Sequence, residues 1–151
     1  METKGLILAH SGPEQSGSPM DRQRPRHLLP VRNEPILFHA LGSRAAAGIR
    51  DVAIAVSSET EDVIGEAVGS GAAWGLRISH LRTASSACLP SVLLAGESFL
   101  DGRPFVLQHG DGLLRDDLGA LLPALEDDEG SEAILLVHPA MRARNRPLAV
   151  P

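Results

Sequence analysis

Residues 4–9, Lys-Gly-Leu-Ile-Leu-Ala, open the stretch that decides the fold of this chain. The stretch continues through a segment from His10 to His27 that is rich in Gly, Pro, Ser and Arg, and it closes with Leu-Leu-Pro-Val at 28–31. The apolar run predicts a short buried strand, and the polar segment predicts a long loop. A buried strand that runs directly into a loop is how an α/β domain presents a phosphate site. This loop lacks the glycines that such a site normally needs, so the architecture and the chemistry disagree.

The composition is that of one globular domain. The chain has 151 residues, of which 43% are hydrophobic and 22% are charged, and its net charge is −5. A chain of this length and hydrophobic content can form one core, and its negative net charge argues against a general nucleic-acid binder. The single cysteine, Cys88, excludes an internal disulfide and a thiolate zinc site, and it fits a reducing compartment such as the cytoplasm. We expect no signal peptide and no membrane-spanning segment, because no apolar run approaches about 20 residues.

Apolar runs of strand length alternate with segments of helical periodicity along the chain. We predict strands at residues 5–9, 52–57, 76–81, 104–108 and 133–137, and helices near residues 35–47, 59–68, 90–100 and 116–125. This alternation predicts an α/β fold: a right-handed, doubly wound, mostly parallel sheet with helices on both faces. The alternative is an α+β fold in which some strands are antiparallel. We expect a single domain over 1–151, with a core at about 4–138 and an arginine-rich tail at 139–151.

One edge of this sheet is the expected binding site. In doubly wound sheets, ligands lie beyond the carboxyl ends of the strands, where the strand order reverses. That position usually brings together the loops after the first and fourth strands, which begin here at His10-Ser11 and at His109-Gly110-Asp111. Asp111 then has two interpretations. It is a metal or nucleotide contact, or it is a turn residue, since Gly-Asp-Gly is ordinary turn chemistry.

Several segments of the sequence match a known family: residues 4–9, 28–31, 47–52, 74–76, 96–99 and 110–111. They resemble the sugar-1-phosphate nucleotidylyltransferases, and most closely the glucose-1-phosphate thymidylyltransferases. The resemblance covers about residues 4–138 and corresponds to the nucleotide-binding half of such an enzyme, without the sugar-binding half. It implies a Rossmann-like α/β fold and a reaction in which a sugar-1-phosphate oxygen attacks the α-phosphate of a nucleoside triphosphate and pyrophosphate leaves. Such a transfer needs glycine amides, cationic side chains at the phosphates and Mg²⁺ held by carboxylates.

The resemblance also implies which residues would form the site. Nucleotide-binding residues would come from the first loop and from the segment after the third strand: Leu8, Ala9, His10, Ser11, Gly12, Thr83, Cys88 and Leu89. Asp111 would be a Mg²⁺ ligand, although its family partner lies in the half that this chain lacks. Arg26 would be the catalytic cation if the chain is active.

The chain departs from the family pattern at most of these positions. His10-Ser11 replaces the family's Gly-Gly, and a histidine side chain would occupy the space into which the nucleotide comes. Residues 13–15, Pro-Glu-Gln, replace the Gly-Thr-Arg that grips the triphosphate, and Arg26 replaces a lysine. In the base-recognition segment a Gln and a Gly become Thr83 and Cys88. Each such loss alone costs about 10²–10³-fold in rate, so we expect a degenerate, non-catalytic member.

Three functions are compatible with this pattern. The first is a domain that has lost catalysis and binds a nucleotide, a sugar nucleotide or a protein partner in a regulatory or accessory role. The second is an active sugar-1-phosphate nucleotidylyltransferase that uses Arg26 and a Mg²⁺ on Asp111. The third is a pure protein-interaction module. Because the missing half leaves apolar surface uncovered, we expect a homodimer or a protein complex, with no nucleic-acid partner and no membrane.

Other polar residues carry weaker signals. Arginines in or beside the first loop and near the end of the sequence form either an anion site or a solvated surface: Arg22, Arg24, Arg26, Arg32, Arg142, Arg144 and Arg146. The side chains of His10, His27, His109 and Asp111 are a candidate transition-metal cluster, although no tight ligand spacing supports it. We expect His39 and His80 to be structural and Cys88 to be a packed small residue.

Overall fold

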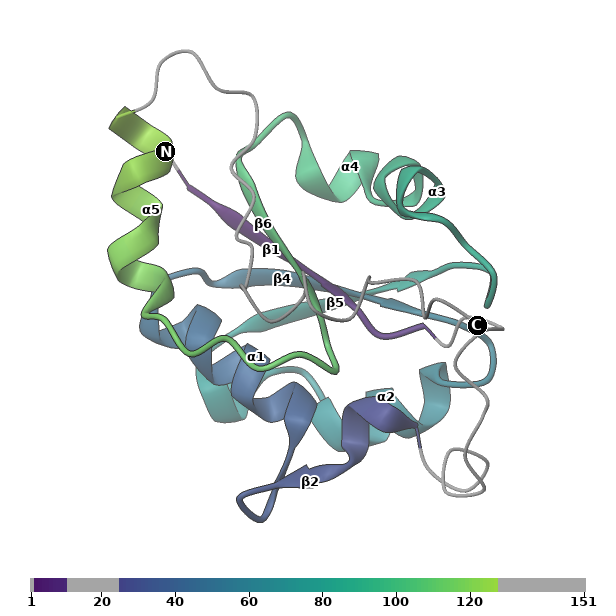
Figure 1. The fold of residues 1–151 in the computed structure, drawn as a ribbon. Coiled ribbons are helices and arrows are strands. Elements are labelled where there is room, and N and C mark those ends of the chain that lie inside the picture. Colours follow the sequence, from purple (N-terminus) through teal and green to yellow (C-terminus); the bar gives the residue numbers. More distant parts are fainter. Residues whose placement is uncertain (1, 11–24, 128–151) are drawn as a thin grey trace, which may run out of the picture.

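Four parallel strands form the central sheet of the computed structural model, which describes residues 2–10 and 25–127 (Figure 1). The strands are β1 (Lys4–Leu8), β4 (Asp51–Val56), β5 (Arg77–Arg82) and β6 (Phe105–His109). They stand in the order β5-β4-β1-β6, and every neighbouring pair is parallel. The predicted parallel sheet is therefore confirmed over these strands. The strand predicted at 133–137 and the tail at 139–151 lie outside the described residues.

The burial of each strand follows from its place in the sheet. β1 and β4 are central, and all their residues are buried except the first of each. Such strands are apolar on both faces, which is why the sequence shows them as continuous apolar runs. β5 and β6 are the outer strands of this sheet, and their residues are half-buried or exposed. The two central strands, β1 and β4, are therefore the buried centre of the domain.

Helices cover both faces of the sheet, as predicted for a doubly wound fold (Figure 1). On one face lie α1 (Ile36–Ala46), α2 (Glu61–Val68) and α5 (Leu118–Asp127). On the other lie α3 (Leu89–Ala95) and α4 (Glu97–Leu100). Each face has its own apolar core: Ile7 and Ile54 point toward α1 and α2, whereas Leu6 and Leu8 point toward α3 and α4. This alternation along β1 is the period-two pattern of a strand buried on both sides.

Two local features differ from the predictions. The single helix expected at 90–100 is two helices, separated at Gly96, where an added Cβ would lie 3.1 Å from Leu81 Cδ1. A short hairpin, β2 (Pro30–Val31) and β3 (Glu34–Pro35), precedes α1 and was not predicted. Its turn residues Arg32 and Asn33 both have positive φ, 53° and 66°. Such two-residue turns usually contain glycine, so this one gave no clear sequence signal.

A buried arginine lies in the core beneath β1 and β6. Residues Leu37, Ala40, Leu41 and Arg44 are the buried positions of α1, so Arg44 occupies the apolar stripe of the helix and is 0% exposed. Its Nη1 donates to Gln108 Oε1 and to Ala40 O, the latter at 3.4 Å. Its Nε and Nη2 have no partner in the described part of the chain. Burial lowers the pKa of the guanidinium to about 10, because a charge is poorly solvated there.

Within residues 2–10 and 25–127, no helix has the length and apolar content that crossing a membrane requires. The described architecture is thus a four-stranded sheet with helices on both faces, the β2–β3 hairpin, and two 3₁₀ turns, η2 (Arg26–Leu28) and η3 (Ala72–Trp74).

Candidate functional site

The carboxyl ends of the four strands form one rim. β1 lies between β4 and β6, so the strand order reverses between β1 and β6, at the place predicted for the binding site. Ala9 leaves β1 there fully buried, and its amide donates to Ala55 O at 2.8 Å. The Gly110 amide donates to Leu8 O at 2.8 Å, which ties the end of β6 to the end of β1. The amide of Ala9 is therefore used by the sheet and does not face a ligand.

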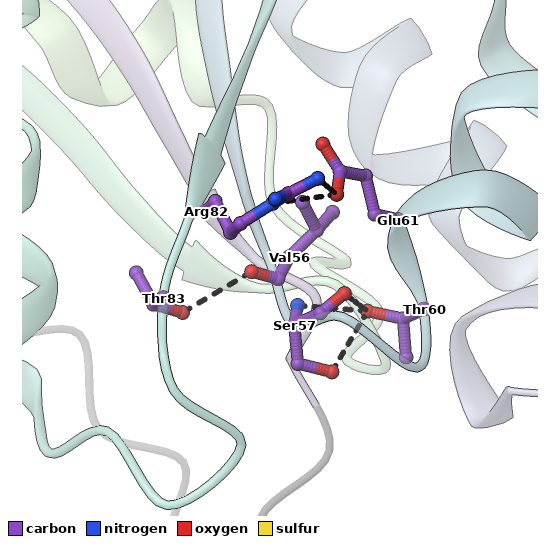
Figure 2. Close-up of polar contacts among 6 residues, drawn as sticks. All are labelled: Val56, Ser57, Thr60, Glu61, Arg82 and Thr83. Atoms are coloured by element: carbon purple, nitrogen blue, oxygen red, sulfur yellow. Dashed lines mark hydrogen bonds and ion pairs between the residues drawn. The ribbon is translucent and has the colours of Figure 1, made fainter.

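A hydroxyl pair fixes the rim between β1 and β4 (Figure 2). Thr60 Oγ1 lies 3.1 Å from Ala9 O, to which it donates, and it accepts from the Ser57 amide at 3.0 Å. Ser57 Oγ lies 3.3 Å from Thr60 Oγ1. Ser57 and Thr60 are 0% and 2% exposed, so these bonds satisfy polar groups that water does not reach. We call this pair the Ser57–Thr60 latch; it holds the backbone at the end of β1 against the turn after β4.

One exposed ion pair and two hydroxyl contacts join β4 and the residues after it to the end of β5 and the segment after it. Arg82 Nε donates to Glu61 Oε2 at 2.7 Å, and Thr83 Oγ1 donates to Val56 O at 3.3 Å (Figure 2). Glu59 Oε2 accepts from Ser85 Oγ at 2.5 Å, and this bond is the main reason that the pKa of Glu59 falls to about 2. Thr83, a predicted nucleotide contact, thus has its hydroxyl turned onto the sheet backbone.

His10 bridges two parts of the rim that the sheet keeps apart. Its Nε2 lies 3.1 Å from Ala87 O, in the segment that follows β5. Since β4 stands between β1 and β5, the imidazole reaches from the end of β1 across the end of β4. His10 Nδ1 is buried and has no partner among the described residues. The side chain therefore occupies space at the rim, as expected from the replacement of Gly-Gly by His10-Ser11.

The other predicted contacts after β5 lie at the start of α3. Cys88 immediately precedes the helix and Leu89 is its first residue; Leu89 is 45% exposed. The prediction that Cys88 is packed is wrong, because the thiol is exposed at the rim and Val92 instead provides the buried contact of α3. Cys88 Sγ lies 3.2 Å from Ser91 Oγ, and this hydrogen bond lowers the pKa of the thiol.

Arg26 and Asp111 meet on the β6 side of the rim. Arg26 belongs to η2 and Asp111 follows β6, and Arg26 Nη1 lies 3.8 Å from Asp111 Oδ2. The two side chains are 35% and 24% exposed. His27 beside them is only 3% exposed, and Gly110 makes room for its ring: an added Cβ would lie 3.2 Å from His27 Cδ2. Burial lowers the pKa of His27 to about 4, against the opposing attraction of Asp111.

The remaining histidines have structural contacts. His39 Nε2 lies 2.8 Å from Val31 O and connects α1 to the hairpin before it. His80 packs against α2, where an added Cβ on Gly65 would lie 3.2 Å from its Cε1. Both are therefore explained without a role at the rim, as expected.

The donor set at the rim does not resemble a metal site. No group of three or more His, Cys, Asp and Glu side chains that could hold a metal ion occurs in the described ranges. The transition-metal cluster of His10, His27, His109 and Asp111 is therefore not supported. For Mg²⁺, Asp111 is the predicted ligand, yet the charged side chain brought to it is a cation, Arg26. The predicted contacts Ser11 and Gly12 and the arginines at 22, 24, 142, 144 and 146 lie outside the described residues.

Comparisons with known proteins agree on one group of relatives. A glucose-1-phosphate thymidylyltransferase from Streptomyces antibioticus is 32% identical over 136 residues, which are 89% of this chain and 38% of the relative. The corresponding enzyme from Streptomyces griseus is 35% identical over 111 residues, 74% of this chain and 31% of the relative. A low-salt glycan biosynthesis nucleotidyltransferase from Haloferax volcanii is 24% identical over 133 residues, 88% of this chain and 37% of the relative. No protein-family model matches the chain.

Solved structures show the same fold. A Bacillus anthracis protein described as a glucose-1-phosphate thymidylyltransferase, in complex with sucrose, superposes with a TM-score of 0.78 at 24% identity over 84% of this chain and 51% of that one. A UDP-glucose pyrophosphorylase complexed with UDP-glucose has a TM-score of 0.65 at 19% identity, over 85% of this chain and 54% of the other. The chain thus spans less than two fifths of the length of its curated relatives and about half of these structures.

Proposed function

Because this chain is a sugar nucleotidyltransferase-like domain related to the glucose-1-phosphate thymidylyltransferases, as the resemblance in its sequence indicated, we propose that it acts by binding and not by catalysis. In this proposal it binds a nucleotide or a sugar nucleotide at the rim, in a regulatory or accessory role. Alternatively, it binds a protein partner at the same rim in that regulatory or accessory role. We also propose that it works in a reducing compartment such as the cytoplasm, where Cys88 stays a free thiol.

The observation that carries the proposed loss of catalysis is the contact of His10 with Ala87. Nucleotidyl transfer depends on holding the triphosphate and the base in one geometry, because positioning supplies most of the acceleration. The imidazole of His10 lies across the rim between β1 and the segment after β5, with its Nε2 3.1 Å from Ala87 O. A nucleotide that entered along the end of β1 would have to displace this ring and break its hydrogen bond.

Two further contacts support a loss of catalysis. The amide of Ala9 and the hydroxyl of Thr83 are both bound to the sheet backbone, at 2.8 Å from Ala55 O and 3.3 Å from Val56 O. Neither is oriented toward a phosphate or a base. Removing one preorganised donor from a catalytic site typically costs about 10²–10³-fold in rate, so several such changes together leave little turnover.

An active enzyme is the alternative, and one observation favours it. Arg26 and Asp111, the two residues that catalysis would need, both lie on this rim at the reversal of strand order. An active site would then require the His10 ring to swing away when substrate binds. Turnover by the unaltered chain separates this alternative from our proposal.

The test measures turnover and binding together. We expect no pyrophosphate release above background from the full chain with glucose 1-phosphate, Mg²⁺ and either dTTP or UTP. We expect His10→Ala to bind dTDP-glucose more tightly than the unaltered chain, which thermal denaturation with a concentration series would show. A ligand at 100 times its dissociation constant adds about 2.7 kcal/mol to the free energy of unfolding.

His80→Ala is the matched control, because it also removes an imidazole but from the α2 face, away from the rim. It should leave ligand binding as in the unaltered chain. Robust release of pyrophosphate by the unaltered chain would contradict the proposal. Equal ligand shifts in His10→Ala and the unaltered chain would show that the bridge does not close the site.

We also propose that the domain associates with a second copy or another protein. Two observations support this: β6 has no strand on its outer side in the described sheet, and Leu94 of α3 is 72% exposed. Light scattering over a concentration series would measure the mass of the purified chain. A monomer at every concentration, and no partner retained on purification, would count against association.

A further inference from the structure

The pairing of Arg26 with Asp111 changes what the aspartate does at the rim. The family resemblance gives Asp111 to Mg²⁺, and a Mg²⁺ site is built from oxygen ligands, usually with more than one carboxylate or with phosphates. Here the charged group nearest to its carboxylate is a guanidinium, with Arg26 Nη1 3.8 Å from Asp111 Oδ2. Among the described residues, Asp111 belongs to no group of three or more His, Cys, Asp and Glu side chains that could hold a metal ion. The carboxylate is thus placed as a counter-ion.

Two neighbouring elements fix the Arg26–Asp111 pair. Arg26 is held in η2, whose next residue, His27, is 3% exposed and packs on Gly110, so the 3₁₀ turn and the end of β6 form one unit. The charged side chains of Arg26 and Asp111 both remain partly open to solvent, at 35% and 24%.

We propose that Arg26 is the phosphate-binding group of this rim without a divalent metal ion, and that Asp111 is its counter-ion and not a metal ligand. The inference rests on the proposed binding function. A guanidinium matches the oxygens of a diphosphate with two parallel hydrogen bonds, and it carries a permanent positive charge. Asp111 then competes with the ligand for the same cation, so it weakens phosphate binding while it holds Arg26 in place.

The sign of one substitution separates the two roles of the aspartate. If Asp111 held Mg²⁺, Asp111→Asn would weaken phosphate binding, and binding would require the metal. If Asp111 is a counter-ion, the same substitution removes a competing anion and strengthens binding. Partly exposed ion pairs are weak, so we expect affinity to rise about two- to fivefold.

The experiment is a calorimetric titration of the full chain with inorganic pyrophosphate, once with Mg²⁺ and once with EDTA. Pyrophosphate has no base, so the His10 bridge should not prevent its binding. We expect equal affinity in both buffers, tighter binding by Asp111→Asn, and a loss of about tenfold or more in Arg26→Gln. Asp101→Asn is the matched control: it makes the same charge change at the left-handed end of α4, where asparagine is tolerated, and it should not alter the affinity.

Each outcome decides the inference. Binding that needs Mg²⁺ and is lost in Asp111→Asn overturns it while leaving the binding function intact. An equal gain of affinity in Asp101→Asn would show that the gain comes from the change in net charge alone, and this result would also overturn the inference. No pyrophosphate binding by any variant overturns it as well. Pyrophosphate release in the turnover assay above would instead contradict the proposed function, so the two failures are distinguishable.

Discussion

Two arginines in two regions of this molecule show how differently a fold treats the same group. Arg44 lies in the interior beneath β1 and β6, is 0% exposed, and has only neutral partners, Gln108 and a backbone carbonyl, among the described residues. Arg26 lies at the rim, is 35% exposed, and has a carboxylate, Asp111, beside it. The interior therefore carries an unneutralised charge, whereas the rim carries a neutralised one that water still reaches.

The difference indicates where a functional charge is to be sought. A buried guanidinium without an anion is costly, and burial already lowers the pKa of Arg44 to about 10. A charge in that position is not available to a ligand. The rim pair costs less free energy to hold, and in the proposed role Arg26 exchanges its carboxylate partner for a phosphate. Three measurements test this contrast between interior and rim.

The largest effect is expected at the rim, from His27 in acid. Its pKa falls from 6.5 to about 4 in the folded chain because burial penalises the charged imidazole. The unfolded chain takes up the proton first as the pH falls. His27 therefore does not lower the free energy of unfolding above pH 6.5. Between pH 6.5 and 4 that free energy falls progressively, by about 3 kcal/mol in total.

Urea denaturation at pH values from 7.5 to about 4 would measure this loss. Other carboxylates also titrate toward the lower end, so the informative quantity is the difference between the unaltered chain and His27→Gln. That difference should depend on pH, because glutamine does not titrate. A constant difference across the range would show that His27 is not buried as a neutral ring.

The second effect tests the interior. Gln108→Leu removes the side-chain acceptor of Arg44 and the donor to Gly112 O, so we expect the free energy of unfolding to fall by about 2 kcal/mol. Adding Arg44→Leu should restore most of this loss, because apolar residues of similar size replace a buried polar pair at little cost. A double-mutant cycle by urea denaturation measures the coupling. Additive losses would contradict the assigned pairing.

The smallest effect compares two hydroxyls of the rim. Thr60→Val preserves shape but removes the hydroxyl that binds Ala9 O, and Thr60 is 2% exposed, so we expect a loss of about 1 kcal/mol. Thr83→Val removes a half-buried hydroxyl with a longer bond, 3.3 Å to Val56 O, and should cost clearly less. Thermal denaturation of both variants measures the contrast. Equal losses would show that the Ser57–Thr60 latch has no special role.

Much of the sheet could be predicted from the sequence because its central strands are buried on both faces. Such strands appear as short, continuous apolar runs, and alternation with helical segments then fixes a parallel topology. The hairpin before α1 could not be predicted, because Arg32 adopts a positive φ without the usual glycine. The break in the helix at Gly96 depends on the approach of Leu81 from another strand, which sequence periodicity does not report.

The placement of the candidate site residues could be predicted in part. The topology rule and the family resemblance together placed Ala9, His10, Thr83 and Asp111 on one rim, and the structure brings them there. What each side chain binds could not be predicted, because it depends on tertiary contacts. Arg26 and Asp111 are far apart in the sequence, so their pairing gives no local signal. The Ser57–Thr60 latch lies in a turn without a recognisable motif. The exposure of Cys88 was missed for the same reason.

The central position of β1 also decides when this domain can fold during synthesis. Gly5 pairs with Val52 and Lys4 pairs with Phe105, so β1 is synthesised before both of its neighbours and waits for them. Parallel pairings between such distant residues close slowly, because a long loop must be ordered before any contact rewards it. Until β6 is made, Leu6 and Ile7 remain without their final neighbours. Apolar residues of β1 therefore stay uncovered while the chain is incomplete, and such exposed surface favours aggregation.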